Sequence, residues 1–154
     1  MITINCEQGT QEWHEHRAGV ITASNFEMCN TRLKTGPNKG EHTKAAKEYA
    51  FRVSVERISG QPLSDDYYQT YAMKRGREME EEARLKHEQA KGILVDQTGI
   101  ALTDDGVFGA SVDGLIDDRG CAEYKCFIGP SSLMPILLNK DLSSVNAQMQ
   151  GQMW

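Results

Sequence analysis

The pattern of apolar residues changes near Gly92, from a helical period before it to short apolar runs after it. The predicted helices cover residues 10–17, 24–30, 44–59 and 67–91, with a loop over 31–41 and a linker over 61–66. Thr43 and Gly60 are favoured N-cap and C′ residues, so they define both ends of the third helix. Ser24 and Glu27 have the spacing of a capping box, which predicts Ser24 as the N-cap of the second helix.

The chain beyond Gly92 alternates short apolar runs with polar turns. The runs cover residues 93–95, 100–102 and 107–108, and the turns lie at 97–99 and 104–106. This alternation predicts an antiparallel meander. Residues 131–138 contain Pro135 and fit no single class, and Ser143 or Ser144 could cap a last helix. Helices followed by a meander and a closing helix predict an α+β layer fold.

Length and composition predict one soluble domain. The chain has 154 residues, and no apolar run approaches the length that crosses a bilayer. Its four cysteines form no dense framework, so reduced thiols in a cytoplasm are expected. The net charge of −5 is unlike that of most nucleic-acid binders. A local basic cluster could still hold phosphates, and its members are Arg32, Lys34, Lys39, Lys44 and Lys47.

The strongest candidate chemistry lies in two short stretches, residues 109–114 and 121–126. Asp113 precedes a polar turn, and Glu123 and Lys125 follow it two residues apart, so both of the latter project from one face of a strand. Two carboxylates and an ammonium at one point make a poor core, because buried charges need partners. They suit a divalent metal beside a phosphodiester.

This interpretation depends on the register of the hairpin. A plain four-residue loop over 117–120 would place Asp113 opposite Tyr124, on the wrong face. A three-residue loop with Gly120 in a bulge, or a bulge at Gly114, would bring Asp113 opposite Glu123. The alternative is a surface hairpin whose acids face water.

Five blocks in chain order resemble the lambda-exonuclease-like family, the YqaJ-type viral recombinases of the PD-(D/E)xK nuclease group. The blocks cover residues 13–24, 76–84, 111–114, 123–126 and 148–150. The resemblance extends over nearly the whole chain. It implies a restriction-endonuclease-like core, with a mainly antiparallel or mixed sheet flanked by helices, as a single nuclease domain over residues 1–154. The family continues with further strand and helix, which leaves open a truncated product or a compact variant.

The resemblance also implies roles for residues of the hairpin. Asp113, Glu123 and Lys125 would be catalytic, and Asp113 and Glu123 would bind Mg²⁺, two ions per site, with Mn²⁺ as a substitute. The backbone carbonyl of Tyr124 would complete the shell. A further ligand comes from the acidic run 80–82, of which at most one member can face the site, since consecutive helical residues point about 100° apart.

Matching the family pattern around the run selects Glu80; the alternative is a solvated helix face. Gln148 would lie on a helix behind the site and act on the scissile phosphate or the attacking water. Gln150 is the alternate for this position, and Gln152 fits it less well. Trp13 is interpreted as a packing residue.

Arg17, Ser24 and Ser111 resemble the family's pocket for a terminal 5′-phosphate. Arginine offers a fork of donors that suits phosphate. Where the family carries another phosphate-binding arginine, this chain has residues 130–132, Pro-Ser-Ser. That departure weakens the expected preference for phosphorylated ends.

The activity implied by the resemblance is a metal-dependent 5′-to-3′ exonuclease that degrades one strand of linear double-stranded DNA in phage-type recombination. Ring-shaped trimers and a single-strand annealing protein as partner are implied in the same way, in the cytoplasm of a bacterial or phage-infected host. Two alternatives remain: a nuclease of the same fold with endonuclease or single-strand activity, and a non-cleaving DNA-binding adaptor.

Overall fold

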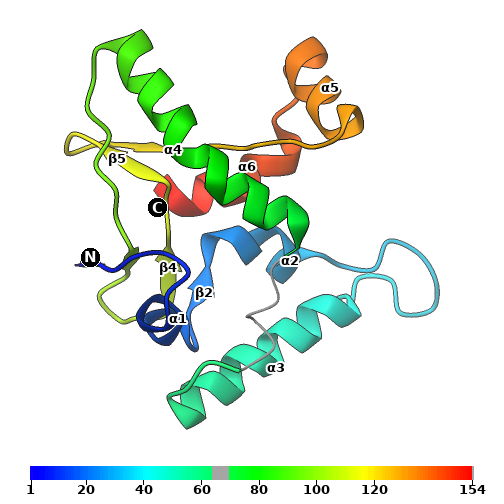
Figure 1. The fold of residues 1–154 in the computed structure, drawn as a ribbon. Coiled ribbons are helices and arrows are strands. Elements are labelled where there is room, and N and C mark those ends of the chain that lie inside the picture. Colours follow the sequence, from blue (N-terminus) through cyan, green and yellow to red (C-terminus); the bar gives the residue numbers. More distant parts are fainter. Residues whose placement is uncertain (64–69, 154) are drawn as a thin grey trace.

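The computed structural model describes residues 1–63 and 70–153 of the chain (Figure 1). The helices are α1 (Gln11–Arg17), α2 (Phe26–Asn30), α3 (Lys44–Ser59), α4 (Tyr71–Lys91), α5 (Pro130–Asn139) and α6 (Ser143–Met153), with a short 3₁₀ helix η1 (Ala23–Asn25). The strands are β1 (Ile2–Ile4), β2 (Ile21–Thr22), β3 (Ile100–Leu102), β4 (Phe108–Ala110), β5 (Gly114–Ile116) and β6 (Gly120–Ala122).

The ends of the long helices follow their capping residues. The Thr43 hydroxyl accepts a hydrogen bond from the backbone N–H of Ala46, and Gly60 ends α3 in the left-handed conformation at φ 66°, as predicted. Thr70 caps α4 in the same way. Residues 64–66 of the predicted linker and 67–69 of the predicted helix lie outside the described residues.

The prediction that Ser24 caps the second helix is wrong. Ser24 lies inside η1, and α2 begins after Asn25 without a side-chain cap. The Ser24 hydroxyl lies 3.2 Å from the Thr22 hydroxyl instead. This bond to a neighbouring side chain takes the place of the capping bond to the backbone, and Ser24 is exposed at the surface.

The strands form two sheets rather than one meander. The larger has the order β1-β3-β4-β2, in which β2 and β4 run parallel and the other pairs antiparallel. The smaller contains β5 and β6. Ile100, at the start of β3, is completely buried. The predicted strand over 93–95 is absent. Only the adjoining Asp96 pairs, in an isolated bridge to Leu115.

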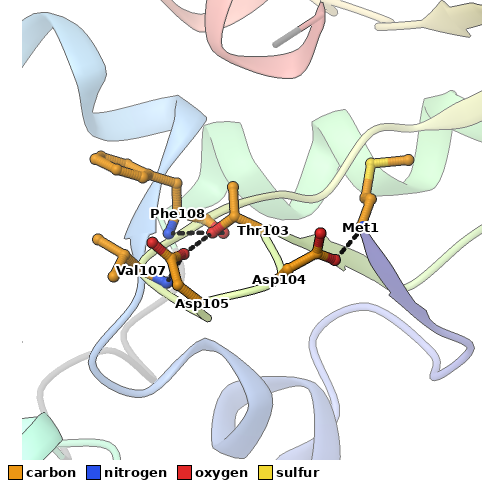
Figure 2. Close-up of polar contacts among 6 residues, drawn as sticks. All are labelled: Met1, Thr103, Asp104, Asp105, Val107 and Phe108. Carbon is orange, nitrogen blue, oxygen red and sulfur yellow. Dashed lines mark hydrogen bonds and ion pairs between the residues drawn. The ribbon is translucent and has the colours of Figure 1, made fainter.

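The turn between β3 and β4 is stabilised by its own side chains (Figure 2). The Thr103 hydroxyl donates to Oδ1 of Asp105 at 2.5 Å and accepts from the backbone N–H of Phe108 at 3.1 Å. Asp105 also accepts from the N–H of Val107, and its hydrogen bond to Thr103 lowers the pKa of its carboxyl. On the adjacent edge, the N-terminal ammonium of Met1 contacts Asp104. This turn directs β4 toward the segment that carries Ser111 and Asp113.

The β5–β6 hairpin has the shifted register on which the site prediction depends. Ile116 pairs with Gly120 and Gly114 with Ala122, so the loop contains three residues. Continuing this register places Asp113 directly opposite Glu123. Asp117, at φ 49°, rather than Gly120, takes the left-handed conformation that closes the loop. Aspartate tolerates this conformation better than most residues, which explains how the loop closes without a glycine bulge.

Helix α6 packs against η1 and α2 through Gly151. A Cβ at this position would lie 2.6 Å from Cδ2 of Phe26, so only glycine allows this close approach. The previously unassigned segment before it forms α5, with Pro130 in the first turn and Pro135 inside. In Figure 1, α5 projects away from the rest of the chain. Within residues 1–63 and 70–153, no helix is long and apolar enough to cross a membrane.

Candidate active site

The two acids of the hairpin meet just beyond its paired residues. Oδ2 of Asp113 accepts a hydrogen bond of 2.6 Å from the backbone N–H of Tyr124. Burial raises the pKa of Asp113 to about 6, against the effect of this hydrogen bond, and the charges of Glu123 and Glu80 add to the rise. Asp113 therefore lies near two other carboxylates in a partly desolvated position, where negative charge is costly.

Three donors surround the Glu123 carboxylate. Nε2 of Gln148 donates to Oε1 at 2.7 Å, and Nε2 of Gln152 donates to Oε2 at 2.5 Å. The Lys125 ammonium also contacts Oε1, as the two-residue spacing predicts, although both residues lie just beyond β6. Glu123 is largely buried, with a side-chain exposure of 11%. A largely buried carboxylate needs such partners to remain charged.

Helix α4 presents one of its three consecutive acids to the hairpin. Glu80 is half-buried, and burial raises the pKa of its carboxyl, with Arg77 opposing and Glu123 adding to the rise. Glu81 and Glu82 are exposed, and Glu82 pairs with Lys86 at 2.6 Å on the outer face of the helix. The structure thus brings Glu80, alone of the three acids, into the electrostatic environment of Glu123 and Asp113, as the family pattern suggested.

Tyr124 points away from the acids and joins the hairpin to α4. Its hydroxyl lies 3.0 Å from Nδ1 of His87, and the two rings meet edge to face. On the same side of α4, Arg84 pairs with Glu88 at 3.3 Å, and Glu88 accepts from the backbone N–H of Val95. These contacts fix the helix that carries Glu80 against the extended segment that carries Glu123. The sequence predicted a strand here, but β6 ends at Ala122, before Glu123 and Lys125.

The donor set fits a hard divalent cation in its chemistry. Carboxylate oxygens are the preferred ligands of Mg²⁺, and a bound cation would favour the charged form of Asp113, whose pKa is raised first by burial and then by the neighbouring carboxylates. Within residues 1–63 and 70–153, however, no three His, Cys, Asp or Glu side chains form a ready ligand cage. The Glu123 oxygens accept contacts from Gln148, Gln152 and Lys125 instead.

A second cluster forms where α1 faces the end of β4. Nη1 of Arg17 donates to the Ser111 hydroxyl at 3.2 Å, and Nη2 contacts the Thr22 hydroxyl at 3.5 Å. Ser24 joins the cluster through Thr22. The three residues predicted to bind a terminal phosphate therefore share one site, and Ser111 lies two residues before Asp113 on the chain.

Trp13 contributes to this cluster, which the sequence interpretation missed. Its indole N–H donates to the Ser111 hydroxyl at 3.0 Å, and the Arg17 guanidinium stacks over its ring at 4.2 Å. The four-residue spacing of Trp13 and Arg17 on one helix was the available signal. Trp13 therefore orients both Arg17 and Ser111.

Helix α3 supports the cluster from behind. Tyr49 accepts from the backbone N–H of Thr22 at 3.2 Å, and the buried Glu56 accepts from the N–H of Gly19 at 3.0 Å. Arg57 donates to the carbonyl of Gly19 at 2.6 Å. The turn at Gly19, which follows Arg17, is therefore held through both its backbone N–H and its carbonyl.

The basic residues near α3 do not join either cluster. Lys47 pairs with Glu41 at 3.0 Å and Lys44 with Glu48 at 3.4 Å, and Arg32 donates to the carbonyl of Gly40. Residues 130–132, which replace an expected arginine, form the start of α5. Two of the five residues of the basic cluster, Lys44 and Lys47, are therefore paired with acids.

A mixed sheet flanked by helices, with two acids and a lysine at the open end of a hairpin, defines a restriction-endonuclease-like α+β fold. The sequence pattern of the YqaJ-like viral recombinase domain matches residues 12–154, and the chain belongs to this family.

Known structures agree with this assignment. The crystal structure of LHK-Exo in complex with dAMP is similar, with 30% sequence identity, a TM-score of 0.74, and coverage of 94% of this chain and 67% of that chain. The crystal structure of an alkaline exonuclease (LHK-Exo) from Laribacter hongkongensis has 29% identity, a TM-score of 0.73 and the same coverage of both chains. No curated protein sequence matches the chain.

Proposed function

We propose that this protein is a metal-dependent exonuclease that degrades one strand of linear double-stranded DNA from its 5′ end. The observation that carries the proposal is the convergence of Asp113, Glu123 and Lys125 at the end of the β5–β6 hairpin. Similarity to an alkaline exonuclease supports the reaction class. The adjoining cluster around Arg17 supports the end preference.

The carboxylates of Asp113, Glu123 and Glu80 and the backbone carbonyl of Tyr124 would hold Mg²⁺, with Mn²⁺ as a substitute. When bound, such a metal lowers the pKa of coordinated water and stabilises charge on the phosphoryl oxygens. Lys125 sits on Glu123 with 39% of its side chain exposed, so its ammonium can reach a nucleophilic water or the phosphate. A fixed positive charge at that point offsets the charge that develops on phosphorus.

Gln148 completes the set on the side of α6. Its amide already contacts Oε1 of Glu123, the oxygen that Lys125 also contacts. An amide has a second hydrogen, which in Gln148 would donate to the scissile phosphate or to the attacking water. Gln148 therefore joins the proposed metal ligands to the substrate.

The Arg17 cluster would receive the terminal phosphate of the strand being degraded. The Arg17 guanidinium and the Ser111 and Ser24 hydroxyls supply donors suited to a phosphate dianion. A site that binds the terminal phosphate beside the hydrolytic centre favours cleavage from an end over internal cuts. This placement is the basis for proposing 5′-to-3′ polarity.

We also propose that the chain assembles into a ring-shaped trimer and works with a single-strand annealing protein. Helix α5 supports an extended protein contact, because it exposes a row of large apolar side chains: Leu133, Met134, Leu137 and Leu138, with Leu142 just beyond it. Light scattering tests the trimer. A trimeric mass that becomes monomeric on Leu137→Glu would support it, and a monomeric wild-type chain would contradict it.

A time course on linear duplex DNA tests the proposed activity. Substrates labelled at either 5′ or 3′ ends, with and without a 5′-phosphate, are incubated with Mg²⁺ or with a chelator, beside an open-circular control. We expect Mg²⁺-dependent release of mononucleotides from 5′ ends, faster on phosphorylated ends, and an intact circle. Cleavage of the circle would indicate an endonuclease, and binding without cleavage would indicate an adaptor.

A further inference from the structure

Helix α6 contacts the Glu123 carboxylate with two amides rather than one. Gln148 and Gln152 are four residues apart, so they lie on one face of the helix, one turn from each other. Their Nε2 atoms reach different oxygens of Glu123, at 2.7 Å to Oε1 and at 2.5 Å to Oε2. Gln150, between them, is exposed and points elsewhere.

The two oxygens of Glu123 differ in their surroundings. Oε1 receives both Gln148 and the Lys125 ammonium, whereas Gln152 donates to Oε2. The terminal torsion of a glutamate is soft, and one contact at Oε1 leaves the carboxylate plane free to rotate about it. A second contact at Oε2 fixes that plane.

The position of Gln152 is itself rigidly set by its neighbour. Gly151 lies against the Phe26 ring and the buried Ala23, where a Cβ would meet Phe26 at 2.6 Å. This close packing of α6 on η1 and α2 determines how far the Gln152 side chain reaches. The backbone that carries the Gln152 amide is therefore fixed by packing.

We infer that Gln152 is a positioning residue that fixes the plane of the Glu123 carboxylate for metal binding. The inference rests on the proposed function for the identity of the ligand, and it adds a second glutamine to the site with a role different from that of Gln148. Gln148 reaches the oxygen shared with Lys125, next to the substrate. Gln152 acts through Glu123 and touches neither substrate nor reacting atoms.

Loss of Gln152 then has a distinct signature. The carboxylate must be ordered when the cation binds, so metal affinity falls, by about tenfold for the loss of a contact behind a metal ligand. Lys125 and Gln148 still contact Oε1, so the rate at saturating metal recovers most of the wild-type value. Loss of Gln148 gives the opposite pattern, a lower rate at saturating metal.

Calorimetric titration with Mn²⁺ in the absence of DNA tests the inference directly. Gln152→Met keeps the length of the side chain and removes the donor, and Gln150→Met is the matched control on the same helix. We expect about tenfold weaker Mn²⁺ binding for Gln152→Met and unchanged binding for Gln150→Met. Gln152→Asn, whose amide is one methylene too short, should behave like Gln152→Met and serves if that variant does not fold.

The outcomes separate this inference from the proposed function. Unchanged Mn²⁺ affinity in both Gln152 variants overturns the role of Gln152, even if the wild type hydrolyses DNA. Weakened Mn²⁺ binding in a chain that never hydrolyses DNA supports Gln152 and overturns the exonuclease. If the wild type binds no Mn²⁺, the inference fails. A Gln152→Met variant whose rate stays low at saturating Mg²⁺ also contradicts a positioning role.

Discussion

Oδ2 of Asp113 accepts a 2.6 Å hydrogen bond from the backbone N–H of Tyr124, across the open end of the β5–β6 hairpin. The bond needs an oxygen at this position but not a negative charge. An asparagine can accept the same bond, so Asp113→Asn separates the geometry of the hairpin from the charge that the proposed metal site requires.

Asp113→Asn should abolish hydrolysis and stabilise the chelator-treated protein at neutral pH. The folded pKa of about 6 exceeds the ordinary value of 3.8, so folding favours the protonated form. That contribution is fully present below pH 3.8 and is lost as pH rises through about 6. Urea unfolding at pH 4 and pH 8 measures it, and we expect the variant to gain stability over wild type at pH 8 only.

The exposed Asp118, in the turn of the same hairpin, provides the control. Asp118→Asn removes the same charge at a solvated position and should change neither activity nor the pH dependence of stability. An Asp113→Asn protein that is less stable than wild type at pH 8 would show that the ionised carboxylate stabilises the hairpin. In that case the acids do not form a strained cluster that awaits a cation.

Lys125→Gln should lower the rate by at least about 100-fold at saturating Mg²⁺, because a fixed charge beside the phosphate is lost. The fold should persist, since Gln148 and Gln152 still hold Glu123. Single-turnover hydrolysis and far-UV circular dichroism check both parts. Lys86→Gln, which breaks an exposed pair with Glu82, should leave the rate unchanged.

Ca²⁺ should support DNA binding with little cleavage, because its loose coordination positions water poorly.

Local signals were enough to predict much of the fold. Thr43 and Gly60 define α3 because capping depends on neighbouring residues alone. The hairpin itself was predictable, but its register was left open between two loop lengths, and the three-residue loop closed by Asp117 decides it. The short strands β1 and β2 carry no such signal, since their partners lie far away in the sequence. The run before Asp96 buries Val95 without forming a strand, because apolar pattern reports burial and not backbone pairing.

The same distinction between local signals and long-range contacts applies to the candidate site. Glu123 and Lys125 lie two residues apart just beyond β6, so their contact is local and the spacing was enough to predict it. The contact of Gln152 with Glu123 depends on how α6 packs on η1, and no spacing rule gives that. Thr22 joins the Arg17 cluster because a parallel pairing of β2 with β4 brings it beside Ser111. Such convergence of distant segments requires the tertiary structure.

Arg17→Ala should slow initiation on 5′-phosphorylated ends by about tenfold or more, because a charge-assisted contact contributes roughly 1.5–3 kcal/mol. Unphosphorylated ends should change little. The ratio of initiation rates on the two kinds of end is the measurement. Arg32→Ala removes an equal charge from an exposed loop and should lower affinity for both ends alike. Equal rates on both ends in wild type and in Arg17→Ala would leave the 5′ polarity without support.

The same substitution at two helical glycines should have opposite effects. Gly76 lies inside α4 with open space around it, so Gly76→Ala should raise the free energy of unfolding by about 1 kcal/mol through helix propensity. Gly151→Ala gains the same contribution from helix propensity, but its Cβ would lie 2.6 Å from the Phe26 ring. Overpacking of this kind costs about 1–3 kcal/mol, so the net change should be destabilising.

Activity distinguishes the two glycine variants further. A Cβ at position 151 would lie 2.6 Å from the Phe26 ring and 3.0 Å from Cβ of Ala23. We expect α6 to shift away from η1 in response, which would withdraw Gln148 and Gln152 from Glu123. Gly151→Ala should therefore need more Mg²⁺ for half-maximal rate and have a lower rate at saturation, whereas Gly76→Ala should retain wild-type kinetics. Urea unfolding and Mg²⁺ titrations of the hydrolysis rate give both readouts. Wild-type Mg²⁺ dependence in a folded Gly151→Ala protein would mean that the packing of α6 does not set the geometry of Glu123.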